Sequence, residues 1–104
     1  MPIFTFKGVS QNEVNKYFEK IEELASIIDT DIKKIVFWHD PSILIANGYE
    51  KNAIEISIKW IARPSKQEAV AKHIQSFFAN ISKNIYVTFR ELNSFLYLNG
   101  ECVG

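Results

Sequence analysis

A pattern of strands and turns that occurs twice is the strongest constraint this sequence places on its fold. Asn-Gly pairs at 47–48 and 99–100 lie half a chain length apart in a sequence of 104 residues. Asn-Gly is a preferred pair for tight hairpin turns, because both residues tolerate positive backbone angles. We therefore interpret the chain as one domain over residues 1–104, with pseudo-repeats at about 1–52 and 53–104.

The first half is predicted to form a strand, a helix and two further strands. Aromatic and β-branched residues favour a strand over 3–7, and Ser10 with Glu13 is typical of a capping box at a helix start. Apolar residues then recur at helical spacing and predict one amphipathic helix that ends near residue 28: Val14, Phe18, Ile21, Ala25 and Ile28. Short apolar runs predict strands over 35–38 and 43–46.

The second half repeats this order. Isoleucines alternate with polar residues in a half-buried strand: Ile54, Ile56 and Ile58. Ser65 and Glu68 form a second capping box, and a second helical stripe follows it: Val70, Ile74, Phe77 and Ile81. Strands over 85–89 and 95–98 complete the repeat.

Each helix is long enough to connect two parallel strands by a right-handed crossover. Two such units predict an α/β (α+β) two-layer sandwich, in which one mixed sheet carries two helices on one face. The runs 43–46 and 95–98 are apolar at four consecutive positions, whereas a strand with one solvated face should alternate. We therefore expect other subunits to cover these strands and the free sheet face, and we predict a homotrimer.

Composition excludes several classes of protein. Lys and Arg total 12 and Asp and Glu total 12, and this balance disfavours a dedicated nucleic-acid binder. Cys102 is the single cysteine, which excludes an internal disulfide framework and a multi-cysteine zinc site. His39 and His73 are isolated, so we expect surface or interface histidines and no metal site. No apolar run is long enough for a membrane span, which favours a cytoplasmic protein without membrane partners.

The chain resembles the tautomerase superfamily that contains macrophage migration inhibitory factor. Three features carry the resemblance: the start Met1-Pro2-Ile3-Phe4, the strand-helix-strand-strand order that occurs in both halves, and the strand over 85–89. The residues Trp60 to Arg63 before the second helix, and the tail 97–101, are similar to a bacterial branch, the domain-of-unknown-function family 1904. The resemblance implies a trimer with clefts between subunits, and a proline that becomes the N-terminus when Met1 is removed. It also implies that this proline acts as a general acid/base for cofactor-independent keto–enol shifts.

The sequence also departs from better-known members of that superfamily. Asp29-Thr30-Asp31 stands where a lysine or arginine is frequent, and the lysines come later, at Lys33 and Lys34. The fifth strand carries Tyr86-Val87-Thr88 in place of Tyr-x-Asn, and the Cys-x-x-Cys motif is absent, which argues against a thiol oxidoreductase.

Pro2 is the catalytic candidate. If the first strands of the two halves run antiparallel at the sheet centre, Trp60, Ile61 and Arg63 border Pro2, and Arg63 is placed to bind a substrate carboxylate in bidentate fashion. The Tyr86 hydroxyl is a candidate donor to a substrate oxygen, and Lys33 a candidate for guiding a small anionic substrate.

Each candidate has a structural alternative. A proline can open a strand for purely structural reasons, Arg63 can be a solvated arginine, and Trp60 and Tyr86 can serve packing. Two hypotheses therefore stand: a tautomerase acting on a small carboxylate-bearing enol or 2-oxo acid, and a non-catalytic homotrimeric binding or structural protein. A ferredoxin-like module that binds a small regulatory ligand is a third, weaker interpretation.

Overall fold

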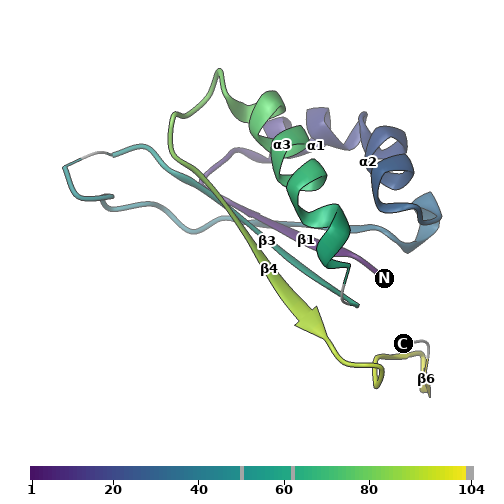
Figure 1. The fold of residues 1–104 in the computed structure, drawn as a ribbon. Helices are drawn as coiled ribbons and strands as arrows, with labels where there is room; N and C mark the ends of the chain where they lie inside the picture. Colours follow the sequence, from purple (N-terminus) through teal and green to yellow (C-terminus); the bar gives the residue numbers. More distant parts are fainter. Residues whose placement is uncertain (50, 62, 103–104) are drawn as a thin grey trace.

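A computed structural model describes residues 1–49, 51–61 and 63–102. Four strands form one sheet in the order β2-β1-β3-β4, and three helices cover one of its faces (Figure 1). Strand β1 (Ile3–Lys7) runs parallel to β2 (Val36–Asp40) and antiparallel to β3 (Ile54–Ile61), which runs parallel to β4 (Ile85–Leu92). The predicted mixed sheet is confirmed, and the first strands of the two halves run antiparallel at its centre, the condition that the predicted neighbourhood of Pro2 required.

The helical segment of the first half differs from its prediction. Two helices, α1 (Gln11–Phe18) and α2 (Ile21–Ile28), replace the single predicted helix, so the helix layer has three members instead of two. Ser10 caps α1 as predicted, because its hydroxyl accepts the Glu13 N–H at 3.2 Å. The break brings Tyr17 into the core and leaves Phe18 48% exposed, so the predicted helical stripe is wrong at Phe18.

The second crossover begins differently from its prediction. Pro64 opens a short 3-10 turn, η2 (Pro64–Lys66), and α3 (Gln67–Phe78) follows directly. Ser65 therefore lies inside a turn, and no side chain caps the start of α3. The ring of Pro64 presets the backbone angle of a first helical position, which explains why the turn begins there. The predicted second capping box is wrong.

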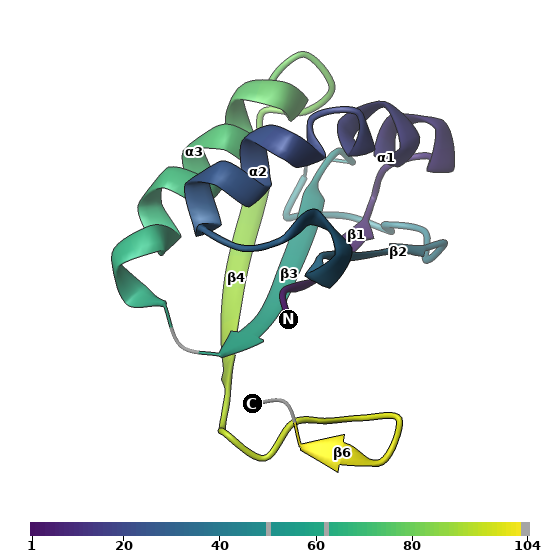
Figure 2. The same ribbon diagram turned by 90° about the vertical axis from the view of Figure 1, so that its right-hand side faces the viewer.

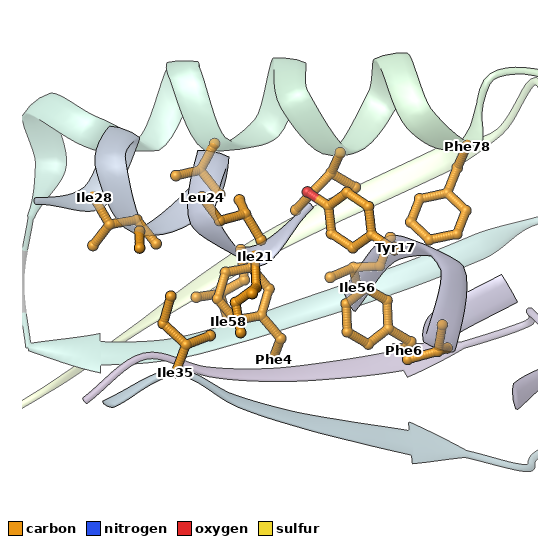
Figure 3. Packing of buried hydrophobic residues seen from close by; sticks show 14 of the residues in the cluster. Phe4, Phe6, Tyr17, Ile21, Leu24, Ile28, Ile35, Ile56, Ile58 and Phe78 are labelled. Atoms are coloured by element: carbon orange, nitrogen blue, oxygen red, sulfur yellow. The ribbon is translucent and has the colours of Figure 1, made fainter. Parts of the chain in front are cut away.

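The core lies between the sheet and the helix layer (Figure 3). Every second residue of β1 and β3 points into it and is fully buried: Phe4, Phe6, Ile54, Ile56, Ile58 and Trp60. The helices contribute Tyr17, Leu24 and Ile28 from one side and Val70, Ile74 and Phe78 from the other. The period-two interpretation of β3 is confirmed, since four consecutive inward positions have no exposed surface.

Two apolar segments extend from opposite ends of the sheet. Residues 41–46, which follow β2, form no strand, and Ile43 and Ile45 are 86% and 84% exposed. The predicted strand over 43–46 is thus wrong for a single chain, because no strand among the described residues pairs with this segment. At the other end, β5 (Tyr97–Leu98) and β6 (Glu101–Cys102) form a hairpin beyond the end of β4 (Figure 2).

The turn of this hairpin confirms the Asn-Gly prediction at 99–100, whereas at 47–48 only Gly48 has a positive φ angle, of 64°. Asn99 and Gly100 have φ angles of 54° and 85°, the left-handed values that a tight primed turn requires.

The two extensions enlarge the molecular surface. The accessible surface is 6955 Å², whereas a compact chain of 12.0 kDa exposes about 6,000 Å². The radius of gyration is 14.1 Å, and about 13 Å is typical of a domain of 104 residues. A single chain therefore leaves exposed apolar surface of the kind that subunit contacts bury.

Candidate functional site at the N-terminal end of the sheet

The strand register places the N-terminus beside the end of β3. Ile3 pairs with Lys59, and one further step along the same antiparallel register puts Pro2 opposite Trp60. Pro2 is buried, and its carbonyl accepts the Val36 N–H at 2.9 Å. Pro2 thus lies on the helix-covered face of the sheet, in the same alternation as Phe4.

Two cations approach the N-terminal amine from different elements. The pKa of the Met1 amine is lowered from its ordinary value, first by burial and then by the positive charges of Arg63 and Lys34. Arg63 precedes η2, and Lys34 belongs to η1 (Ile32–Lys34), the short turn before β2. The N-terminal amine therefore lies near two positive charges and is partly withdrawn from water.

Lys34, rather than the predicted Lys33, is the lysine near the N-terminal amine. Lys33 is exposed, and its backbone N–H donates to the Asp31 carboxylate at 2.9 Å, which caps η1. Lys34, and not Lys33, contributes to the lowered pKa of the amine. Sequence reasoning noticed both lysines, but a two-residue pattern does not indicate which side chain turns toward the terminus.

Arg63 is held in place by the helix layer. Its Nη1 donates to the carbonyl of Ile28 at 2.9 Å, at the C-terminal end of α2, where helix carbonyls lack partners. This contact gives Arg63 a structural role in anchoring α2. The guanidinium has five N–H donors, so the anchored side chain retains donors for an anion near the amine.

Trp60 and Ile61 project to opposite sides of β3. Trp60 is fully buried and stacks on Phe89, with ring centroids 4.9 Å apart, while Ile61 is half-buried on the open face. Among the described residues the buried indole Nε1 of Trp60 has no hydrogen-bond partner. A buried donor left unpaired costs about 1–3 kcal/mol, so an acceptor that reached it would recover part of that energy.

Tyr86 lies at the other end of the sheet. It pairs with Glu55, and the four-residue step from Glu55 to Lys59 along β3 spans about 13 Å. The Tyr86 hydroxyl accepts from Asn47 Nδ2 at 3.0 Å, beside a cavity of about 380 Å³ beneath residues 42–47. One chain therefore brings Pro2, Trp60 and Arg63 together and does not bring Tyr86 to them.

A second cluster of titratable groups lies in the helix layer, which sequence reasoning missed. The Tyr17 hydroxyl is 2.8 Å from His73 Nδ1, and His73 Nε2 is 3.0 Å from a Glu23 carboxylate oxygen. Burial and the Glu23 charge raise the pKa of Tyr17, and the hydrogen bond from His73 lowers the pKa of Glu23. No local pattern indicates this cluster, because its members come from α1, α2 and α3.

His39, the other histidine expected at the surface or at an interface, also has a hydrogen-bond partner. His39 Nε2 lies 2.7 Å from the Val9 carbonyl, which ties β2 to the turn after β1. In the part of the chain that the structure describes, no three His, Cys, Asp or Glu side chains gather closely enough to hold a metal ion. Within the same residues, no helix has the length and hydropathy needed to cross a bilayer.

Comparison with solved structures defines the class of fold. A homologue of macrophage migration inhibitory factor from Prochlorococcus marinus superposes with a TM-score of 0.80 at 14% identity, covering 98% of this chain and 99% of that chain. A "fused 4-OT wild type asymmetric trimer" superposes with a TM-score of 0.76 at 13% identity, covering 96% of this chain and 94% of that one. The fold is that of the tautomerase and migration-inhibitory-factor proteins.

Within this class, the chain belongs to DUF1904, a domain of unknown function whose family model matches residues 1–102. A DUF1904 structure from Sebaldella termitidis has a TM-score of 0.87 at 18% identity, covering 98% of this chain and 99% of that chain. No curated protein matches the chain significantly. The predicted resemblance to both groups is confirmed.

Proposed function

We propose that this protein is a cofactor-independent keto–enol tautomerase that acts on a small carboxylate-bearing enol or 2-oxo acid in the cytoplasm. The observation that carries the proposal is the partly buried N-terminal amine, whose pKa Arg63 and Lys34 help to lower. Removal of Met1 transfers the amine to Pro2, which is more deeply buried. The same physical causes then favour a neutral secondary amine at physiological pH, as a general base requires.

The chemistry needs one group that accepts and returns a proton. The neutral Pro2 amine takes a proton from the carbon next to the substrate carbonyl, which leaves an enolate. The protonated amine then gives that proton to the enolate oxygen and forms the enol; the reverse sequence converts enol to ketone. The proline ring restricts rotation of the nitrogen, so little ordering remains for the transition state.

The surrounding charges fit a substrate with a carboxylate. Arg63 and Lys34 are the cations beside the amine, and together they attract an anion to it. The Trp60 N–H, which has no partner among the described residues, is a further donor on the same face of the sheet. Ile61 borders the open face, and Lys33 remains a candidate for guiding the anion from outside.

The proposed active form is a homotrimer. The exposed apolar segment at 43–46 and the β5–β6 hairpin lie at opposite ends of the sheet, so a ring of copies can bury both. Such a ring brings Tyr86 of one copy toward Pro2 of the next. The solved 4-OT trimer shares this fold, which supports the proposal by analogy.

An aryl-pyruvate assay tests the proposal. Protein with a free Pro2 amine should interconvert the keto and enol forms, and its rate should rise with pH through one ionisation. Protein that retains Met1 should be inactive, because its Pro2 nitrogen is an amide. Intact mass identifies each form, and equal activity of the two would refute the proline mechanism.

Matched lysine variants test the charge argument. Removing a cation near an amine raises the pKa of the amine, so Lys34→Ala should move the pH–rate profile to higher pH. Lys33→Ala removes the same charge one residue away and should leave the profile in place. Arg63→Ala should raise KM about ten- to hundredfold for the carboxylate substrate. An equal shift in both lysine variants would contradict the assigned geometry.

A non-catalytic homotrimeric binding or structural protein is the second candidate. It is favoured by the Arg63 contact with the Ile28 carbonyl and by the complete burial of Trp60, since both residues already have packing roles. A processed, trimeric protein without tautomerase activity would support this alternative.

A further inference from the structure

The segment between α2 and β2 lies beside the N-terminus of the chain (Figure 2). In the parallel register of β1 and β2, Ile3 pairs with Val36. One step back along this register puts Pro2 opposite Ile35, and the 2.9 Å hydrogen bond from the Val36 N–H to the Pro2 carbonyl fixes the alignment. Lys34 comes directly before Ile35 and ends η1. The backbone of η1 therefore carries Lys34 to the N-terminal end of the chain.

The Asp31 carboxylate closes η1 at its start. Its Oδ1 accepts the Lys33 N–H at 2.9 Å, and the Asp31 carbonyl accepts the Lys34 N–H, also at 2.9 Å. The Ile35 N–H donates to the Ile32 carbonyl at 3.1 Å. A 3-10 turn of three residues makes few internal hydrogen bonds, so a cap that satisfies one of its N–H groups contributes a large share of its stability. Loss of this acceptor should let η1 unwind.

The charges near the amine are held by different elements. Burial lowers the pKa of the N-terminal amine, and the charges of Arg63 and then Lys34 add to the effect. Arg63 has its own anchor, the Ile28 carbonyl. Lys59 on β3 alternates with the inward-facing Trp60 and so points to the side of the sheet that the helices leave uncovered. Among the described residues no carboxylate forms an ion pair with Lys34, so η1 itself determines where its ammonium group lies.

We propose that Asp31 is a positioning residue of the candidate site, whose carboxylate closes η1 and thereby holds the Lys34 ammonium group beside the N-terminal amine. The catalytic consequence rests on the proposed function, whereas the effect on the amine does not. A negative charge near an amine favours the ammonium form. The charge of Asp31 and its hydrogen bond, which acts through Lys34, therefore have opposite effects on the pKa of the amine.

An NMR titration of the N-terminal amine tests the proposal without requiring activity. Met1 is the only methionine, so methionine with an isotope label at Cα gives one signal that follows its amine in protein that retains Met1. Asp31→Asn and Asp31→Ala both remove the charge, but only Asp31→Asn keeps an oxygen acceptor in its place. At low ionic strength, the pKa of the amine should be higher in Asp31→Ala than in Asp31→Asn by about 0.2–1 pH unit, the range expected when a unit charge moves a few ångströms away.

Two controls separate positioning from a general loosening of the chain. In a Lys34→Ala background the two Asp31 substitutions should give the same amine pKa, because the cation through which they act is gone. Asp40 accepts the Ser42 N–H at 2.9 Å in a similar turn after β2. Asp40→Asn and Asp40→Ala should therefore also give equal amine pKa values. Circular dichroism should show that both Asp31 variants keep the fold, since Asp31 is exposed.

Activity of the processed protein gives a second readout. Its pH–rate profile should lie at higher pH in Asp31→Ala than in Asp31→Asn. Three results overturn the inference: equal amine pKa values in the two Asp31 variants, a difference that persists in the Lys34→Ala background, or an equally large difference between the two Asp40 variants. The expected pKa difference in a protein whose processed form is inactive would exclude the proposed function and still support the positioning role of Asp31.

Discussion

Replacing Tyr17 with Phe tests how the helix layer is held together. The substitution removes one oxygen and keeps a buried ring that packs against Phe37, Phe77 and Phe78. It deletes the 2.8 Å contact to His73 Nδ1, through which α1 is connected to α3 and, by Glu23, to α2. The His73 side chain retains 16% exposure, so water can partly replace the lost partner. We expect a loss of about 0.5–1.5 kcal/mol in unfolding free energy at pH 7.

The pH dependence gives this variant a distinct signature. Burial, and then the charge of Glu23, raises the pKa of Tyr17 in the folded state. An unfolded tyrosine titrates near pH 10, so the stabilisation is complete below about pH 10. Above that pH the unfolded chain releases a proton that the folded chain keeps. Stability should then fall by up to about 1.4 kcal/mol per pH unit.

Urea unfolding at fixed protein concentration, repeated between about pH 9 and 11, measures this slope. Wild type should show it, and Tyr17→Phe should lack the Tyr17 contribution. Tyr49→Phe removes the same atom from a fully exposed side chain outside both apolar extensions and should leave the slope unchanged. An unchanged slope in Tyr17→Phe would refute the assignment of the raised pKa to this residue.

Three further substitutions test the fold and its assembly. Gly8→Ala places a Cβ 2.4 Å from the Ala53 carbonyl oxygen at φ +90°, whereas Gly48→Ala meets no atom within 4 Å at φ +64°. Thermal melts should show a loss of about 1–2 kcal/mol for Gly48→Ala and a clearly larger one for Gly8→Ala; equal losses would exclude the backbone clash. Ile45→Asp changes a side chain that is 84% exposed in one chain, so it should preserve the monomer fold and shift light scattering from trimer to monomer. An unchanged trimer would remove this segment from the interface.

The sheet was predictable because its signals are local. Ile54, Ile56 and Ile58 alternate with polar residues, and this period alone assigns their burial. The crossover rule then orients the strands, since a strand-helix-strand unit of this length returns parallel. The antiparallel pairing of β1 with β3 was only a condition of the sequence argument; the structure supplies it, and it brings Arg63 near the N-terminus.

The features that the sequence did not predict depend on contacts between residues that are far apart along the chain. An apolar run such as 43–46 forms a strand only if a partner strand exists, and the described residues of one chain supply none. Tyr17 and Phe18 are both aromatic, and the break between α1 and α2 decides which of them enters the core. The Tyr17–His73 contact joins residues 56 positions apart, so it depends on the packing of α1 against α3.

The geometry of one chain also explains why its candidate site is incomplete. Strand β2 runs parallel to β1, so the segment at 43–46 leaves the sheet at the Tyr86 end; β4 runs the other way, so the β5–β6 hairpin leaves at the Pro2 end. Each end therefore carries one exposed apolar extension and one part of the proposed site. A contact between unlike ends is heterologous, and such contacts close into a ring or extend without limit. A closed ring buries both extensions in every copy and joins the two parts of the site at each junction. In the proposed enzyme, the same contact between unlike ends therefore holds the ring together and completes the active site.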